Sequence, residues 1–173
     1  FRKAYELRMR GTRIEVVPDI LMNLADANNR LGKLDIGAAW YRRALLMCDS
    51  LHIASTKKPP IYYGLAQVYV TMRDFEQCDY YYNLAGESYD NMLPYEKYIY
   101  LNNRGTSYYY REDYQTAIKY FQKVIDLVEG YADMSFELNL GRLNLGDCYL
   151  QLNMVDLAVK YINECQLFLR KWG

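Results

Sequence analysis

Hydrophobic and small residues recur along most of this chain with the spacing of one face of an α-helix. Tyr62, Leu65, Ala66 and Tyr69 follow one another at i, i+3, i+4 and i+7, which places their side chains on one side of a helix with 3.6 residues per turn. Short polar breaks such as "MRDF" and "REDY" separate these stretches in pairs, as a turn between two antiparallel helices does. The pattern predicts helices near residues 19–31, 35–53, 60–72, 76–91, 96–111, 115–129, 137–152 and 156–171.

The helical pattern repeats with a period of about 40 residues. Equivalent stretches begin at Leu24, Leu65, Arg104 and Leu145, at intervals of 41, 39 and 41 residues. Small residues occupy equivalent points of the repeats, namely Ala25, Ala66, Gly105 and Gly146 in the first helix and Gly37, Cys78, Ala117 and Ala158 in the second. The large residues Tyr41, Tyr82 and Phe121 fill the space opposite. Small residues facing large ones let two helices approach closely and still fill the core between them.

Helical hairpins in which a small residue faces an aromatic one resemble the tetratricopeptide repeat. The strongest match is "YLNNRGTSYYYREDYQTAIKYFQKVI", which begins at Tyr100. The unit is near 40 residues rather than the usual 34 or so, which is similar to the repeats of MalT-type bacterial regulators and kinesin light chains. The chain departs from the pattern at Arg104 and Arg142, which take usually apolar positions, and at Asn28, which replaces a tyrosine. The resemblance implies an all-α fold, a right-handed superhelix of helical hairpins.

The repeats predict a single domain that covers residues 1–173. Residues 1–17 would form the second helix of a truncated repeat plus a loop, and the complete repeats would be 18–58, 59–97, 98–138 and 139–173. The chain does not begin with Met, so we expect it to be a piece of a longer protein.

The charge balance and the apolar segments exclude two classes of partner. Lys and Arg together number 21, as do Asp and Glu, so the formal net charge is zero. A protein that binds the phosphate backbone needs a basic surface, so we expect no direct contact with nucleic acid. The longest uncharged stretch, residues 59–72, has 14 residues, whereas a membrane-spanning helix needs about 20. No membrane insertion by this segment is expected, and residues 1–13 show no apolar core of a signal peptide.

No group of residues has the composition of a catalytic, cofactor or metal site. His52 is the only histidine, and a metal site or a nucleophile–base pair usually needs a partner for it. The four cysteines, Cys48, Cys78, Cys148 and Cys165, form no CxxC pair and are interpreted as buried thiols. Most of the 20 tyrosines fall on core positions of the repeat. We therefore expect no enzyme and no cofactor.

The residues opposite the core face of each first helix form a second, more polar face. In the third complete repeat Leu101, Gly105 and Tyr108 define the core face, and a step of about 100° per residue places Asn102, Asn103 and their neighbours on the opposite side. First helices of stacked hairpins line a concave surface, so this face is the predicted peptide-binding groove. Its residues are Met22, Asn23, Asp26, Tyr63, Gln67, Asn102, Asn103, Thr106, Tyr109, Leu143, Asn144 and Asp147.

Asparagine recurs at one position of this groove. Asn103 has equivalents at Asn23 and Asn144, and Gly64 interrupts the row. Kinesin light chains and the glycosyltransferase that adds N-acetylglucosamine to proteins have such a row, and the resemblance implies that these amides bind the main chain of an extended peptide. The alternative is that the amides only solvate a helix face or bridge neighbouring repeats. The lysine and arginine clamp of chaperone-binding tetratricopeptide domains has no counterpart, because no cation occupies the candidate positions.

The sequence thus predicts a non-catalytic scaffold that binds a protein or a peptide. By resemblance, it would be the sensory or regulatory region of a bacterial signal-transduction protein. The alternative is a structural module for stacking, or for homodimerisation through exposed terminal repeats, with no ligand in the groove. Unpaired cysteines slightly favour the cytoplasm, although an extracytoplasmic sensor is compatible with the same sequence.

Overall fold

The computed structural model describes residues 16–50, 52 and 57–172, which contain no β-strand. Their α-helices are α2 (Val17–Arg30), α3 (Leu34–Ser50), α4 (Lys58–Thr71), α5 (Phe75–Gly86), α6 (Pro94–Tyr110), α7 (Tyr114–Val128), α8 (Ser135–Gln151) and α9 (Val155–Trp172). Two short 3-10 helices are η3 (Tyr89–Asn91) and η4 (Ala132–Met134). The all-α fold of helical hairpins is therefore confirmed. The helix predicted within residues 1–17 lies almost wholly outside the described residues.

The helix positions agree with the prediction except at the end of α5. That helix ends at Gly86, five residues before the predicted end, and η3 follows it. Glycine is a poor helix former because fixing its backbone costs more entropy than for other residues. The N–H groups of Glu87 and Ser88 bond back to the carbonyls of Asn83 and Ala85, so the last turn tightens and closes the helix.

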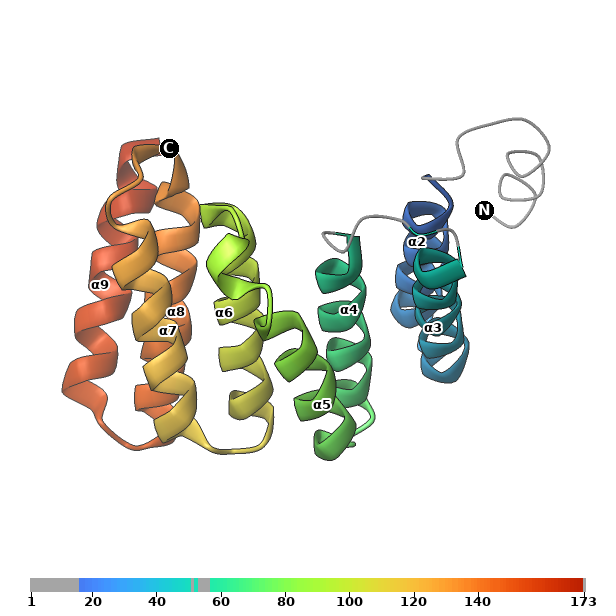
Figure 1. Ribbon diagram of the computed structural model, residues 1–173. Coiled ribbons are helices and arrows are strands. Elements are labelled where there is room, and N and C mark those ends of the chain that lie inside the picture. Colours follow the sequence, from blue (N-terminus) through green and yellow to red (C-terminus); the bar gives the residue numbers. More distant parts are fainter. Residues whose placement is uncertain (1–15, 51, 53–56, 173) are drawn as a thin grey trace. The chain divides into compact units, whose positions relative to one another are not determined.

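The same turn closes each of the four hairpins (Figure 1). Gly32, Arg73, Glu112 and Asn153 lie at equivalent points and have positive φ angles of 57 to 72°. The next residue in each turn donates its N–H to a carbonyl five positions earlier, for example Asp113 to Tyr108 at 3.0 Å. This is the Schellman arrangement, which satisfies carbonyls at the end of the first helix while the chain reverses. Asp74 and Asp113 then cap the second helices by accepting the N–H of Gln77 and Thr116, both at 3.1 Å.

Small residues face large ones inside the hairpins, as the sequence predicts. Ala25, Ala66, Cys78, Ala117 and Ala158 are fully buried. In the α6–α7 hairpin, a Cβ atom on Gly105 would lie 2.7 Å from Cε1 of Phe121. Since that distance is below van der Waals contact, only glycine lets the Phe121 ring approach α6 so closely.

A stacked tyrosine pair joins the two helices of three hairpins. The pairs are Tyr69–Tyr81, Tyr108–Tyr120 and Tyr149–Tyr161, with ring centroids 5.5 to 5.7 Å apart and nearly parallel planes. In the α2–α3 hairpin the equivalent positions hold Asn28 and Trp40. Asn28 instead donates its side-chain N–H to the carbonyl of Leu24, so the departure noted in the sequence removes the pair from this hairpin.

The two arginines at usually apolar positions are accommodated in different ways. Arg104 is buried, and its guanidinium lies over the ring of Tyr108, 5.2 Å from the centroid. Arg142 is half-buried and pairs with Glu164 of α9 at 3.1 Å.

The chain divides into two compact units, the first ending at Asp90 and the second beginning at Asn91. The first unit contains the hairpins α2–α3 and α4–α5, and the second contains α6–α7 and α8–α9. Within each unit the second helix of the first hairpin packs against the next hairpin, and the two first helices also touch: α2 with α4, and α6 with α8. Side chains on neighbouring first helices can therefore form a shared site.

Candidate binding site on the first helices

The predicted site residues of the second unit lie on α6 and α8. Asn102, Asn103, Thr106, Tyr109 and Asn144 are half-buried, whereas Leu143 and Asp147 are exposed. Leu101, Gly105, Leu145 and Gly146 on the same two helices are buried and form the core face. The sequence therefore separated the two faces of these helices correctly.

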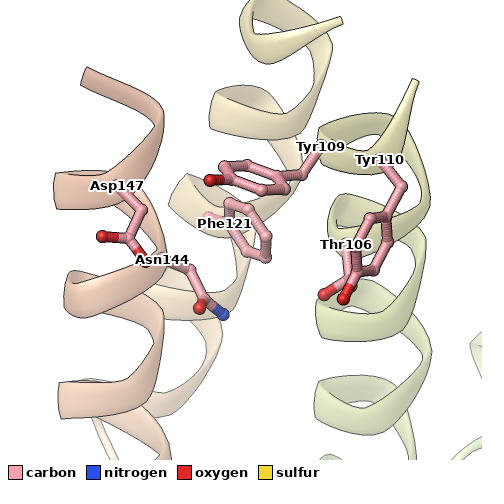
Figure 2. Close-up of a pocket in the computed structure, with 6 residues that line it drawn as sticks. All are labelled: Thr106, Tyr109, Tyr110, Phe121, Asn144 and Asp147. Atoms are coloured by element: carbon pink, nitrogen blue, oxygen red, sulfur yellow. The ribbon is translucent and has the colours of Figure 1, made fainter. Parts of the chain in front are cut away.

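A pocket of about 200 Å³ lies among these residues (Figure 2). Its lining consists of Thr106, Tyr109, Tyr110, Phe121, Asn144 and Asp147. Figure 2 shows Phe121 behind the opening, between the α6 side chains and the two α8 side chains. The pocket brings together four predicted site residues, namely Thr106, Tyr109, Asn144 and Asp147.

Tyr110 and Phe121 are lining residues that the predicted site set omits. The sequence assigns Phe121 to the core, and the ring is indeed buried, yet one side of it faces the pocket. Tyr110 is exposed next to Tyr109 on α6. A signal for Phe121 exists in the sequence, because the equivalent residues Tyr41 and Tyr82 carry a hydroxyl that Phe121 lacks.

Asn102 accepts hydrogen bonds from two residues that line the pocket. Asn144 donates its Nδ2 group to Oδ1 of Asn102 at 2.9 Å, and Thr106 donates its hydroxyl to the carbonyl of Asn102 at 2.9 Å. The amides of Asn102 and Asn144 thus bridge neighbouring repeats. The carbonyl oxygen of Asn144 and the lone pairs of the Thr106 hydroxyl remain as acceptors.

Tyr109 is held by two other tyrosines. Its ring makes edge contacts with Tyr110 and Tyr114, with centroids 6.1 and 5.4 Å away. Gln151 at the end of α8 donates to its hydroxyl at 3.4 Å. Burial, and secondly the nearby charge of Asp147, raises the pKa of Tyr109. The hydroxyl is therefore neutral at physiological pH.

The asparagines of the predicted row have different surroundings. The half-buried side chain of Asn103 makes no hydrogen bond within the described part of the chain. Asn144 is the member that bridges to Asn102. Asn23 is exposed on α2 of the first unit.

The predicted site residues of the first unit are largely engaged within the unit. The Tyr41 hydroxyl donates to the carboxylate of Asp26, and the Tyr82 hydroxyl donates to Gln67 at 3.4 Å. Met22 packs against the core, and Tyr63 is half-buried. Burial, followed by the hydrogen bond to Asp26, raises the pKa of Tyr41 well above its usual range.

Gly64 interrupts the asparagine row because the Tyr41 ring lies against it. A Cβ atom on Gly64 would lie 2.6 Å from the hydroxyl oxygen of Tyr41 and 2.5 Å from its Cε1 atom. No side chain fits there while Tyr41 keeps this position. The interruption therefore has a local packing cause.

The described residues hold neither a metal-binding cluster nor a membrane-spanning helix. Within that part of the chain no three His, Cys, Asp or Glu side chains lie close enough together to hold a metal ion. No helix there is long and apolar enough to cross a membrane. All four cysteines are buried and none of them forms a disulfide within the described residues, and burial raises the pKa of Cys148 to about 12.

Residues 98–131 and residues 141–167 each match a family model described as the tetratricopeptide repeat. No curated protein sequence matches the chain. Among solved structures the chain is similar to BtubC (BKLC) from P. vanneervenii, with a TM-score of 0.83, 21% identity, and 99% of this chain and 71% of BtubC covered. It is also similar to the apo form of RapI, with a TM-score of 0.77, 14% identity, and 99% of this chain covered. The chain spans 48% of RapI, about half its length.

These matches agree with the hairpin geometry: two segments of the chain match the tetratricopeptide repeat, and its fold is that of helical-hairpin repeat proteins. Tetratricopeptide repeats indicate a protein-interaction scaffold. Proteins with this fold are generally non-catalytic. Which subtype of repeat it carries stays a prediction.

Proposed function

We propose that this chain binds an extended segment of a partner protein along the polar face of its first helices. The observation that carries this proposal is the second unit's pocket, which lies beside side-chain amides that still have groups available for hydrogen bonds. The side chain of Asn103 makes no hydrogen bond within the described residues, and the side chain of Asn144 keeps a free carbonyl oxygen after its bond to Asn102.

The chemistry of the amides fits a peptide main chain. A carboxamide offers a donor and an acceptor, and an extended peptide presents the same two groups unpaired at every residue. Such bonds hold the main chain without reading its side chains. Each would contribute about 0.5–1.5 kcal/mol net.

Selection of peptides on the purified chain tests this proposal. A random library of peptides of about 12 residues is panned against it, and the affinity of a selected peptide is measured by calorimetry. The double variant Asn103→Ala/Asn144→Ala should bind this peptide roughly 5- to 150-fold more weakly, since two bonds are lost. Asn163→Ala, which removes an exposed amide from α9, is the matched control and should bind normally.

Two outcomes would count against the proposal. If no peptide is selected, the face is not a peptide site. If the double variant melts normally and binds with unchanged affinity, the amides are not the ligands, and only their bridge between repeats remains.

The repeat length supports a sensory or regulatory role in a bacterial signalling protein. Units of about 40 residues resemble those of MalT-type regulators, and we propose the same context here, with the four repeats acting as one domain. The full gene tests it: an output domain encoded on the same chain would agree, and a gene encoding only repeats would not.

A second candidate function is a stacking or dimerisation module. The observation that favours it is the exposure of Val155 and Val159, one turn apart on α9 and 51% and 48% exposed. Sedimentation analysis should then show a dimer that Val155→Lys/Val159→Lys dissociates, and a monomer at all concentrations would exclude it.

A further inference from the structure

The free polar atoms of the pocket are mainly hydrogen-bond acceptors. Asn144 uses one amide N–H, and Thr106 its hydroxyl hydrogen, in bonds to Asn102, which leaves the oxygen atoms of both side chains and one N–H of Asn144 available to a ligand. Asp147 adds a carboxylate, which only accepts when ionised. A ligand for this pocket must therefore supply several donors.

The pocket also carries an uncompensated negative charge. The side chain of Asp147 makes no hydrogen bond or ion pair within the described part of the chain, and none of the six lining residues is a lysine or an arginine. A positive charge on the ligand would pair with this carboxylate.

Aromatic rings provide the remaining walls. Tyr109 and Tyr110 stand nearly perpendicular to each other, at 84°, and Phe121 forms the third aromatic surface. The faces of such rings attract cations, and a planar guanidinium also stacks on them.

We propose that this pocket binds the guanidinium group of an arginine in the partner segment, with Asp147 as its counter-charge. The inference rests on the proposed peptide binding and adds the identity of one side chain. Arginine has five N–H donors in a plane and no acceptor, so it matches the carboxylate, the two free oxygens and the aromatic walls together. Lysine satisfies the charge, but its compact ammonium neither stacks nor forms paired bonds with a carboxylate.

The test uses the peptide selection described above and a substitution at Asp147. Selected sequences should share an arginine at one position. Replacing that arginine by citrulline, which keeps the shape but not the charge, should weaken binding to the wild-type chain about tenfold or more. Lysine at this position should bind between the two. Asp147→Asn should weaken binding of the arginine peptide by a similar factor.

A double-mutant cycle separates this contact from a general effect on the fold. Asp147→Asn should change the affinity for the citrulline peptide less than twofold, because citrulline carries no positive charge to pair with the carboxylate. Asp126→Asn is the matched control, since it makes the same charge change at an exposed position of α7, and it should bind the arginine peptide normally.

The outcomes distinguish this inference from the proposed function. Peptides that bind without a shared arginine, or equal binding by Asp147→Asn and the wild type, would overturn the arginine pocket and leave peptide binding intact. Failure to select any peptide would overturn both.

Discussion

The same place in the repeat is closed in the first unit and open in the second, although equivalent residues lie 80 positions apart in the sequence. In the first unit the hydroxyl of Tyr41 donates to Asp26, and the ring covers Gly64. In the second unit Phe121 has no hydroxyl to donate, and Asn144 takes the place of the glycine. The shared hairpin therefore supports either internal packing or a pocket, and the side chains decide which.

Charge is also distributed differently in the two units. Arg30 occupies the position equivalent to Tyr110, and Gln67 occupies the position equivalent to Asp147. The first unit's carboxylate, on Asp26, is bound by a tyrosine hydroxyl, whereas that of Asp147 is available to a ligand. A polar side chain on the groove face is thus a candidate for binding only when the next helix does not already use it.

The largest expected effect comes from Gly64→Ala in the first unit. The new methyl group would lie within 2.6 Å of the buried Tyr41 side chain, so the ring must shift, at a cost of about 1–3 kcal/mol in the free energy of unfolding. Urea denaturation measures this cost. Gly146→Ala is the control and should cost less, because its methyl group would lie 3.3 Å from Ile162, which has to shift by only a few tenths of an ångström. Equal stability of the wild type and Gly64→Ala would show that Tyr41 does not close the site.

Phe121→Tyr should convert the open site toward the closed one. The added hydroxyl would enter the pocket beside Thr106, as that of Tyr41 reaches Asp26, and should weaken binding of the arginine peptide about tenfold, or ~1.4 kcal/mol. The free energy of unfolding should change by less than about 0.5 kcal/mol. Calorimetry and denaturation on the same sample measure both. Unchanged binding would place the ligand elsewhere on the face.

Tyr41→Phe removes the hydroxyl that binds Asp26. It should lower the free energy of unfolding by about 1.5 kcal/mol, the lower end of the range for a hydrogen bond to a charged group. The difference in the free energy of unfolding between the wild type and Tyr41→Phe depends on pH. Since the pKa of Tyr41 is raised in the folded state, the advantage is complete below the unfolded pKa of about 10 and is lost as the pH rises above it. Denaturation at about pH 8 and about pH 11 should show the difference between the two proteins shrinking at the higher pH. A constant difference would mean that the hydroxyl does not donate to Asp26 in solution.

The smallest effects should be alike in the two units. Asp74→Ala and Asp113→Ala each remove an N-cap and should each lower the free energy of unfolding by about 1 kcal/mol. Asp126→Ala, on an exposed face of α7, is the control. Different costs at the two caps would show that the hairpins are less equivalent than their geometry indicates.

Periodicity was sufficient to predict the helices and the two faces of α6 and α8, because burial of one face imposes the 3.6-residue spacing directly on the sequence. It did not identify Phe121 as a lining residue. A ring buried on one side and open on the other has the same periodicity as a core residue. Periodicity left open whether the amides bridge neighbouring repeats and could not single out the bond from Asn144 to Asn102, because this bond depends on the distance between α6 and α8. The helix end at Gly86 was missed because the helical spacing of side chains continues beyond this glycine, whereas the backbone leaves the helix there.

The hydroxyl that distinguishes Tyr41 from Phe121 also bears on how such a protein diversifies. The codons for tyrosine and phenylalanine differ by one nucleotide, so a point mutation is enough to exchange the two residues. Repeats that arise by duplication begin with the same ring at this position, and a single base change would then supply or withdraw the group that occupies the groove. An array of these repeats could gain a ligand site in one copy while the other copies keep the chain folded.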